Sequence, residues 1–270
     1  MHFPYLESLL ERINGARFFT KIDLRGAYKL VRIRPGDEWK IVFLTRYGHF
    51  EYTVMSFGLN NASTVFQHME NDILRDLLDV CLIIYLDDLL VYSETQEEHD
   101  SHVLLVLKRL REHGLYAKLE KCSFGCNQVE FLGYVISSKG IKSIDPGKVK
   151  TVVEWQTPRS VRDVQCFLGF ANFYRKFIWD YSKLILPLTQ LTKKGQSFVW
   201  SEETDRAFKR LKRAFISAPI LAHVDPEKPF VIEADASDFT LGSILSQRGN
   251  DEKLHPVAFH SRKFDAAEIN

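Results

Sequence analysis

The most constraining feature of this 270-residue chain is an uninterrupted apolar run that leads directly into two adjacent acids. The run is Val80–Leu86, and Asp87 and Asp88 follow it at once. A short apolar run of this kind, bounded by turn-forming residues, is typical of a strand buried in a core. Two carboxylates at its end repel each other unless a cation neutralises them. The pattern therefore indicates either a solvated turn, where aspartate is common, or a cation site.

A second apolar strand pattern also carries an acid at its end. Residues 18–24 read as a strand that contains Asp23, and Gly26 follows shortly after it. If the two strands share a sheet, Asp23 lies at the same edge as Asp87 and Asp88. Carboxylate oxygens suit Mg²⁺, which completes its coordination with water and substrate phosphates. Two such ions, about 3.5–4 Å apart, would activate an attacking oxygen and stabilise a leaving one.

The apolar spacing along the rest of the chain predicts the α+β class. Period-two and β-branched patterns predict strands over 18–24, 29–33, 41–44, 49–54, 80–86, 89–92, 129–137, 230–234, 242–247 and 257–261. Helical spacing predicts helices over 5–13, 61–79, 96–113, 145–155, 161–178 and 202–216. Thr95 and Glu98 form the sequence of a capping box at the start of the third helix, and Gly114 ends it.

The charge of the chain is unevenly distributed although its total is only +1. Residues 1–100 carry a net charge of −6, residues 101–220 carry +11 and residues 221–270 carry −4. An acidic block that could hold cations therefore lies beside a basic block that could hold phosphates. Chance clustering of surface charge is the alternative explanation.

The composition excludes several classes of protein. With 45% apolar residues and 20 Phe, the chain can build a core, which excludes disorder and a collagen-like repeat. Its four cysteines are typical of reduced intracellular thiols rather than of a disulfide scaffold. The longest apolar run is too short to span a bilayer, and no signal peptide is recognisable. We therefore expect a protein of the cytoplasm or nucleus that is not secreted and has no membrane partner.

Seven stretches of the sequence together carry a family resemblance. They are LLERINGARFFTKIDLRGAY, TRYGHFEYTVMSFGLNNASTVFQ, IIYLDDLLVYS, EEHDSHVLLVLKRLREHGLYAKLEKC, VEFLGYVIS, VRDVQCFLGFANFYRKFI and IEADAS. In their order and spacing they resemble the reverse transcriptase of long-terminal-repeat retrotransposons, specifically the gypsy-like group and its relatives among retroviral polymerases. The matches span nearly the whole chain, whereas the YLDD tetrapeptide alone would be weak.

The resemblance implies a fold, a domain order and an activity. The fold would be a polymerase palm, made of an antiparallel sheet and helices, followed by a helical thumb and connection. The palm with partial fingers would cover residues 1–137, the thumb 138–190, the connection 191–227 and a truncated ribonuclease H-like domain 228–270. The activity would be RNA-directed DNA synthesis on an RNA or DNA template with a primer, from deoxynucleoside triphosphates.

The resemblance also implies roles for residues near the acids. Asp23, Asp87 and Asp88 would be catalytic and would hold Mg²⁺, with Mn²⁺ as a substitute. Tyr28 would lie under the sugar of the incoming nucleotide and exclude a 2′-hydroxyl, and Phe57 would lie close to that nucleotide. Packing of Tyr28 on the sheet and of Phe57 in the core are the alternatives.

Further residues would contact the primer and template. Leu132, Gly133 and Tyr134 match the turn that positions the primer end. Gln165, Gly169 and Phe173 are spaced four residues apart on one face of a helix that would lie along the primer minor groove. Arg175 and Lys176 would contact phosphates or lie on a solvated face. Asp235 matches the first carboxylate of the ribonuclease H site, whose other acids would lie after Asn270.

Three departures from the family pattern bear on activity. The chain begins where the family is already past much of its fingers, so the basic residues that hold the triphosphate are expected to be absent. Ser56 and Ser63 replace usual prolines, which frees the backbone. Ala27 follows Gly26 where the family has Ser-Gly, and it would be strained at a positive φ. The alternative function is therefore an inactive derivative that binds nucleic acid or a protein; an unrelated phosphohydrolase would require discarding every other match.

Overall fold

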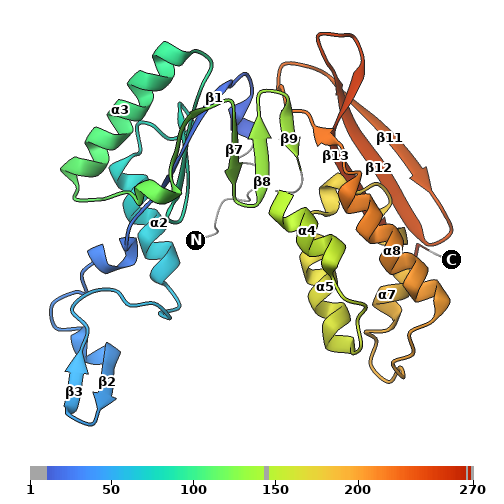
Figure 1. Ribbon diagram of the computed structural model, residues 1–270, viewed down its shortest axis with the longest axis horizontal. Coiled ribbons are helices and arrows are strands. Elements are labelled where there is room, and N and C mark those ends of the chain that lie inside the picture. Colours follow the sequence, from blue (N-terminus) through green and yellow to red (C-terminus); the bar gives the residue numbers. More distant parts are fainter. Residues whose placement is uncertain (1–10, 143–145, 266, 269–270) are drawn as a thin grey trace. The chain divides into compact units, whose positions relative to one another are not determined.

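The structure is a computed structural model that describes residues 11–142, 146–265 and 267–268. It divides into two units, Met1–Leu132 and Gly133–Asn270 (Figure 1). Most of the helix expected over residues 5–13 lies outside the described residues, and Glu11–Ile13 form a single 3-10 turn. Within the described ranges, no helix is long and apolar enough to cross a membrane.

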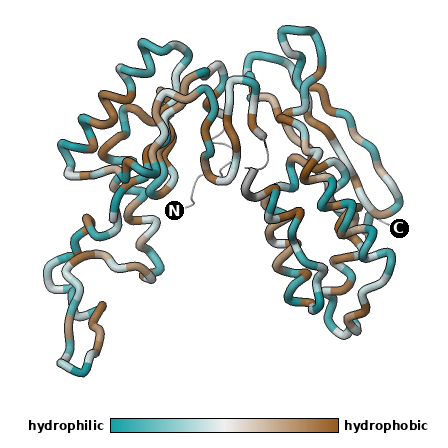
Figure 2. Tube along the Cα trace, in the orientation of Figure 1, coloured by the Kyte–Doolittle hydropathy of each residue, from teal (hydrophilic) through white to brown (hydrophobic). Residues whose placement is uncertain are grey.

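The first unit is built on an antiparallel sheet with the strand order β4-β5-β1-β6. Its strands are β1 (Phe18–Asp23), β4 (Leu82–Tyr85), β5 (Asp88–Ser93) and β6 (Ser123–Cys126). Strands β1, β4 and β5 are buried at most positions, which agrees with the apolar runs of β4 and β5, whereas β1 also carries Thr20 and Lys21. These strands form the brown, hydrophobic centre of the unit in Figure 2. The predicted strands at 18–24, 80–86 and 89–92 are therefore confirmed, with slightly different ends.

Two helices, α2 (Ala62–Ile73) and α3 (Gln96–Glu112), cover one face of this sheet. Phe66 from α2 and Val106 and Leu110 from α3 pack in one buried cluster with Ile22 and Leu89 of the sheet. The capping box predicted for α3 is present, since the Thr95 side chain accepts from the Glu98 backbone and Glu98 returns the interaction. Helix α2 is much shorter than the predicted range 61–79, because a turn region follows Ile73.

A separate hairpin of β2 (Val42–Thr45) and β3 (Gly48–Glu51) confirms the predicted turn at Tyr47-Gly48 (Figure 1). The predicted strand over 29–33 is wrong. Gly26 has a φ of 59° and turns the chain into a 3-10 helix, Ala27–Leu30, and only Arg32 forms an isolated bridge with Val54. The positive φ falls on Gly26, so Ala27 avoids the strain considered above.

The predicted strand over 129–137 is also wrong as a single element. It is divided into β7 (Gln128–Phe131) and β8 (Tyr134–Ser137). Leu132 and Gly133 between them have φ values of 50° and 85°, which no strand residue adopts. In the second unit, β8 pairs with β9 (Gly140–Lys142), which pairs with β10 (Ile220–Leu221).

The helices of the second unit pack around an aromatic core. They are α4 (Pro146–Glu154), α5 (Val161–Phe173), α6 (Tyr181–Leu184), α7 (Leu186–Gln190) and α8 (Glu202–Ile216). Phe167 of α5 lies 4.7 Å from Phe208 of α8 and 5.3 Å from Trp155, measured between ring centroids. The helix predicted over 161–178 ends at Phe173, and a 3-10 turn, Arg175–Phe177, follows it.

The chain ends in an antiparallel meander of β11 (Phe230–Ala236), β12 (Thr240–Arg248) and β13 (Leu254–Lys263). Each of the three strands predicted in this region is present and longer than predicted. The mixture of helices with antiparallel sheets confirms the α+β class.

Candidate active site

The ends of β1 and β5 bring two of the three candidate acids together. Asp23, the last residue of β1, is the direct cross-strand partner of Asp88, the first residue of β5. Side chains of such partners project from the same face of a sheet. Asp87 lies in the two-residue turn between β4 and β5, and its carbonyl oxygen accepts a 2.9 Å hydrogen bond from the Leu24 amide. Asp87 is therefore tied to β1 through its backbone.

Lysine ammonium groups neutralise the two paired acids. Asp23 is only 8% exposed, and its carboxylate oxygens lie 3.0 Å from Lys118 Nζ and 3.6 Å from Lys121 Nζ. The hydrogen bond to Asp23 raises the pKa of Lys118, and the negative charges of Asp23 and Asp87 add to this effect. Lys21 Nζ lies 3.1 Å from Asp88 Oδ1, at ion-pair distance but without hydrogen-bond alignment. Buried charge of this kind requires a cationic partner.

The chemistry of the three acids fits a divalent cation. All the donors are carboxylate oxygens, which hard cations such as Mg²⁺ prefer. The lysines supply at this site the positive charge that a bound cation would supply. As the side chains lie here, however, the described residues contain no group of three or more His, Cys, Asp or Glu side chains arranged to hold a metal ion.

Gln67 of α2 supports the turn that carries Asp87, and sequence reasoning missed it. Its Oε1 accepts a 2.8 Å hydrogen bond from the Leu86 amide, and its Nε2 donates to Asn71 Oδ1 at 3.0 Å. Leu86 has a φ of 54°, a conformation that costs a leucine free energy. The buried amide of Gln67 therefore helps to hold the turn in this conformation. The sequence carried no clear signal for this role, because α2 contains many polar residues besides Gln67.

Glu70, one turn further along α2, is a second residue that the sequence did not reveal. It is 0% exposed, and neither of its carboxyl oxygens has a hydrogen-bond partner within the described part of the chain. Burial raises the pKa of Glu70 to about 9, and the negative charge of Asp87 contributes to the rise. Glu70 is therefore a neutral acid at pH 7.

The structure brings the two predicted nucleotide contacts together. The rings of Tyr28 and Phe57 lie 5.2 Å apart, and Tyr28 also stacks on Phe66 at 5.0 Å. The Tyr28 hydroxyl donates to Ser63 Oγ at 3.4 Å, so one of the two serines that replace usual prolines has a contact of its own. Phe57 is 74% exposed and is not a core residue.

The predicted primer contacts of the second unit fall into two groups. Gln165, Gly169 and Phe173 lie on the exposed side of α5, and a Cβ added to Gly169 would meet no atom within 4 Å. Leu132 and Gly133 form the turn before β8, and the ring of Tyr134, the first residue of β8, stacks on Phe173 at 5.4 Å. Asp235 is exposed on β11, opposite Gly242 of β12. Glu268 is paired with Arg262, which lowers the pKa of that carboxyl to about 2.

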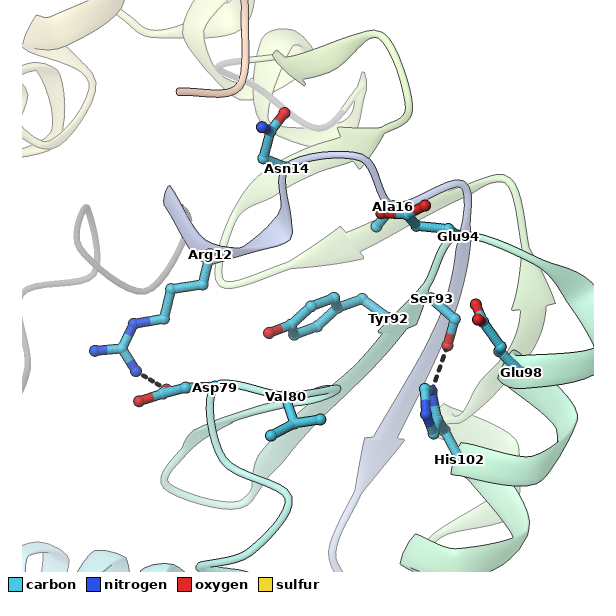
Figure 3. Close-up of a pocket in the computed structure, with 10 residues that line it drawn as sticks. All are labelled: Arg12, Asn14, Ala16, Asp79, Val80, Tyr92, Ser93, Glu94, Glu98 and His102. Atoms are coloured by element: carbon cyan, nitrogen blue, oxygen red, sulfur yellow. Dashed lines mark hydrogen bonds and ion pairs between the residues drawn. The ribbon is translucent and has the colours of Figure 1, made fainter. Parts of the chain in front are cut away.

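A pocket of about 420 Å³ in the first unit contains none of the predicted site residues (Figure 3). His102 lines it, and its Nδ1 lies 2.8 Å from Ser93 Oγ. Ser93 Oγ in turn lies 3.1 Å from Nδ1 of the buried His99, whose Nε2 lies 2.8 Å from Thr20 Oγ1. This series of hydrogen bonds ties α3 to β5 and β1. The polar side chains in the series therefore have a structural role.

Comparison with solved structures defines the class of protein to which this fold and site belong. The foamy viral protease-reverse transcriptase in complex with RNA/DNA hybrid matches with a TM-score of 0.87 at 25% identity, over 99% of this chain and 36% of that chain. The form described as dRH in complex with double-stranded DNA matches with a TM-score of 0.89 at 25% identity, over 100% of this chain and 47% of that chain. The fold is therefore that of a retroviral reverse transcriptase, as the resemblance implied.

The family follows from the sequence comparisons. The family described as reverse transcriptase (RNA-dependent DNA polymerase) matches residues 1–136, and the RNase H-like domain found in reverse transcriptase matches residues 200–270. The chain belongs to the reverse transcriptase family, whose members generally use divalent metal ions.

Its curated relatives are transposon polyproteins. The Tf2-3 polyprotein of Schizosaccharomyces pombe is 39% identical over 267 residues, and the Tf2-7 polyprotein of the same organism is 38% identical over 267 residues. Each match covers 99% of this chain but 20% of the relative. The chain thus spans about a fifth of the length of these relatives.

Proposed function

We propose that this chain is the reverse transcriptase part of a retrotransposon Pol polyprotein of the gypsy-like group. It transfers deoxynucleotides to a primer 3′-hydroxyl, directed by an RNA or DNA template. The observation that carries the proposal is the register of β1 and β5, which pairs Asp23 with Asp88 and ties the Asp87 turn to Leu24. Membership of the family and the transposon relatives support the same function.

Asp23, Asp87 and Asp88 would hold Mg²⁺, or Mn²⁺ in its place. The bound ions would ease deprotonation of the primer hydroxyl and neutralise the triphosphate as pyrophosphate leaves. In the absence of a bound cation, the negative charges of Asp23 and Asp88 are balanced by the ammonium groups of Lys118, Lys121 and Lys21. Gln67 contributes by holding the Leu86–Asp87 turn in place.

Tyr28 and Phe57 would contact the incoming deoxynucleoside triphosphate. Their rings are neighbours, and Tyr28 is fixed from behind by Phe66 and by Ser63. A ring fixed in this way can exclude a 2′-hydroxyl, because it cannot move aside without disturbing the packing. The exposed side of Phe57 is available for the nucleotide.

The second unit would hold the primer and template. The exposed side of α5, with Gln165, Gly169 and Phe173, would lie along the primer minor groove, and Leu132, Gly133 and Tyr134 would position the primer end. The solved relatives named above were obtained in complex with RNA/DNA hybrid and with double-stranded DNA, which supports this assignment. Basic residues of this region would contact phosphates without sequence preference.

The finer division of the chain is part of the proposal. We assign residues 1–137 to the palm together with fingers residues, 138–190 to the thumb, 191–227 to the connection and 228–270 to a ribonuclease H-like domain. Asp235 would be the first carboxylate of that nuclease site. The family match over residues 200–270 supports the last assignment in outline.

A second candidate function is a catalytically inactive module that binds nucleic acid or a protein. Glu70 favours it, because a fully buried acid without a hydrogen-bond partner in the described residues is unfavourable beside a catalytic turn. The intact set of Asp23, Asp87 and Asp88 favours the polymerase.

Primer extension on poly(rA)/oligo(dT) separates these two functions. The purified chain is incubated with labelled dTTP and Mg²⁺, and Asp87→Asn is the active-site control. The proposal requires incorporation that Asp87→Asn abolishes. Absence of incorporation, together with salt-dependent binding of primer–template in a filter or polarisation assay, would leave the binding module as the function.

A further inference from the structure

Tyr134 is enclosed by residues from the end of α5 and the turn that follows it. Its ring stacks on Phe173 at 5.4 Å with an interplanar angle of 18°, meets Tyr174 edge-on at 5.9 Å and lies 5.7 Å from Phe177. Tyr134 is only 2% exposed. Tyr134 is therefore held on several sides by the C-terminal end of α5 and the turn after it.

Tyr174 also binds the backbone of the residue before Tyr134. Its hydroxyl donates to the Gly133 carbonyl oxygen at 3.4 Å, and its ring is almost fully buried. Leu132 and Gly133 both have positive φ, and Leu132 adopts that conformation at a cost in free energy. A backbone in such a conformation persists when the surrounding structure determines it. The Tyr174 hydroxyl is one of the groups that determine it here.

Lys176 adds a charged contact to the same ring. Its Nζ lies 5.0 Å from the Tyr134 ring centroid and 5.4 Å from that of Phe177, within the range of cation–π attraction. The side chain is half-buried and directed over these rings. This geometry departs from that of a lysine extended toward a phosphate on a solvated helix face.

We propose that Tyr174 and Lys176 are positioning residues for the primer end. This inference rests on the proposed function and concerns Tyr174, to which the resemblance gave no role, and Lys176, which it left as a phosphate contact or a residue of a solvated face. Tyr174 holds the Gly133 carbonyl and Lys176 holds the Tyr134 ring, so the turn and the exposed side of α5 move as one piece. The primer end and the minor-groove contacts are thereby kept in fixed register, although neither residue touches the substrate.

The first test separates positioning from binding. Tyr174→Phe removes only the hydroxyl, and Tyr181→Phe is its matched control, because Tyr181 is equally buried but its hydroxyl has no hydrogen-bond partner in the described residues. We expect Tyr174→Phe to slow single-turnover extension of bound primer about threefold to tenfold, the value of one hydrogen bond, with the primer–template Kd unchanged. Tyr181→Phe should match the wild type. Equal rates for the two variants would overturn the role of Tyr174.

The positioning role of Lys176 is tested by removing its positive charge. Lys176→Met should slow extension without changing the salt dependence of primer–template binding, and Lys176→Arg should restore the rate because it keeps a cation over the ring. A phosphate contact predicts the opposite result: the slope of log Kd against log salt would fall by about one for Lys176→Met. That outcome would overturn the assignment of Lys176.

Amide hydrogen exchange gives a measurement that does not require polymerase activity. Tyr174→Phe should speed exchange over residues 133–136 relative to both the wild type and Tyr181→Phe, since the turn loses a contact that fixes it. If Tyr174→Phe exchanges faster but the chain extends no primer, the proposed function is rejected and the role of Tyr174 in fixing the turn is retained. Unchanged exchange in an active chain would reject the positioning role and keep the function.

Discussion

Two buried carboxyl groups of the first unit, Asp23 and Glu70, differ in what surrounds them. Asp23 lies at the end of β1 with two lysine ammonium groups within 3.6 Å of its oxygens. Glu70 lies fully buried on α2, near enough to Asp87 for that negative charge to raise its pKa, and neither of its oxygens has a hydrogen-bond partner in the described ranges. Burial alone therefore does not decide the role of an acid. The cations around Asp23 keep a charge available for a metal ion, whereas the surroundings of Glu70 favour its neutral form.

Asp23 and Glu70 should differ most in their effect on catalysis. Asp23→Asn should lower the rate of primer extension by about 10³-fold or more, because it removes a carboxylate from the metal site. Glu70→Gln keeps the size of a side chain that is already neutral, so its rate should stay within a few-fold of the wild type. Steady-state extension assays at saturating primer–template measure both. An equal loss in the two variants would show that Glu70 belongs to the catalytic site.

Glu70 should dominate the dependence of stability on pH. Its pKa is about 9 in the folded state and 4.5 by its ordinary value, so the folded chain retains a proton that the unfolded chain releases between these pH values. Stability therefore falls as pH rises through this window, by about 3 kcal/mol at pH 7. Glu70→Met should recover about that amount and flatten the profile.

Urea unfolding at several pH values measures this effect. Glu97→Met is a suitable control, because Glu97 is exposed in the first turn of α3. A wild-type stability that does not change between pH 5 and 9 would contradict the assignment of Glu70 as a buried neutral acid.

Removing the lysine partners of Asp23 should have a smaller effect, and a metal ion should reverse it. Lys118→Met leaves the buried Asp23 carboxylate with less positive charge, so the thermal midpoint should fall. Lys121→Met should have less effect, because Lys121 is more exposed and lies 3.6 Å from Asp23 rather than 3.0 Å. Added Mg²⁺ should restore much of the lost stability in Lys118→Met. If Mg²⁺ has no effect on either variant, the lysines do not occupy the place of a cation.

The smallest effect on stability should come from His99. Both ring nitrogens of His99 lie at hydrogen-bond distance from hydroxyl oxygens, whereas the carboxyl group of Glu70 has no hydrogen-bond partner in the described residues. Burial lowers the pKa of His99 below 6.5, so the unfolded chain takes up a proton that the folded chain excludes. Stability should therefore fall as pH drops below 6.5, and His99→Gln should flatten this part of the profile. His223 in the second unit is lowered in the same way, so His223→Gln separates its contribution. An unchanged acid slope in His99→Gln would contradict the assignment.

Much of the fold and the proximity of Asp23 to Asp88 could be predicted from the sequence, because the signals are local. Strand β1 ends at Asp23, β4 ends shortly before Asp87 and β5 begins at Asp88, so these acids meet at one edge when the strands pair as a tight antiparallel sheet. The divided strand at 128–137 was not predicted, since Leu132 adopts a positive φ that its residue type does not indicate.

The residues that support the site could not be predicted, because their contacts are remote in the sequence. Lys118 lies 95 positions from Asp23, and Gln67 lies 19 positions from Leu86. A polar residue within a helical pattern does not reveal whether it faces solvent or core. Glu70 is the clearest case, since it occupies a fully buried position in α2 that composition and spacing would assign to an apolar side chain.

Binding of Mn²⁺, followed by electron paramagnetic resonance of the free ion, is a direct test of whether the acids at the ends of β1 and β5 form a metal site. We predict that the wild-type chain binds Mn²⁺, that Mg²⁺ displaces it, and that Asp23→Asn and Asp88→Asn each abolish the binding while Glu70→Gln retains it. Binding that survives in Asp23→Asn, or that is lost in Glu70→Gln, would contradict the assignment of the acids at the ends of β1 and β5 as the metal site.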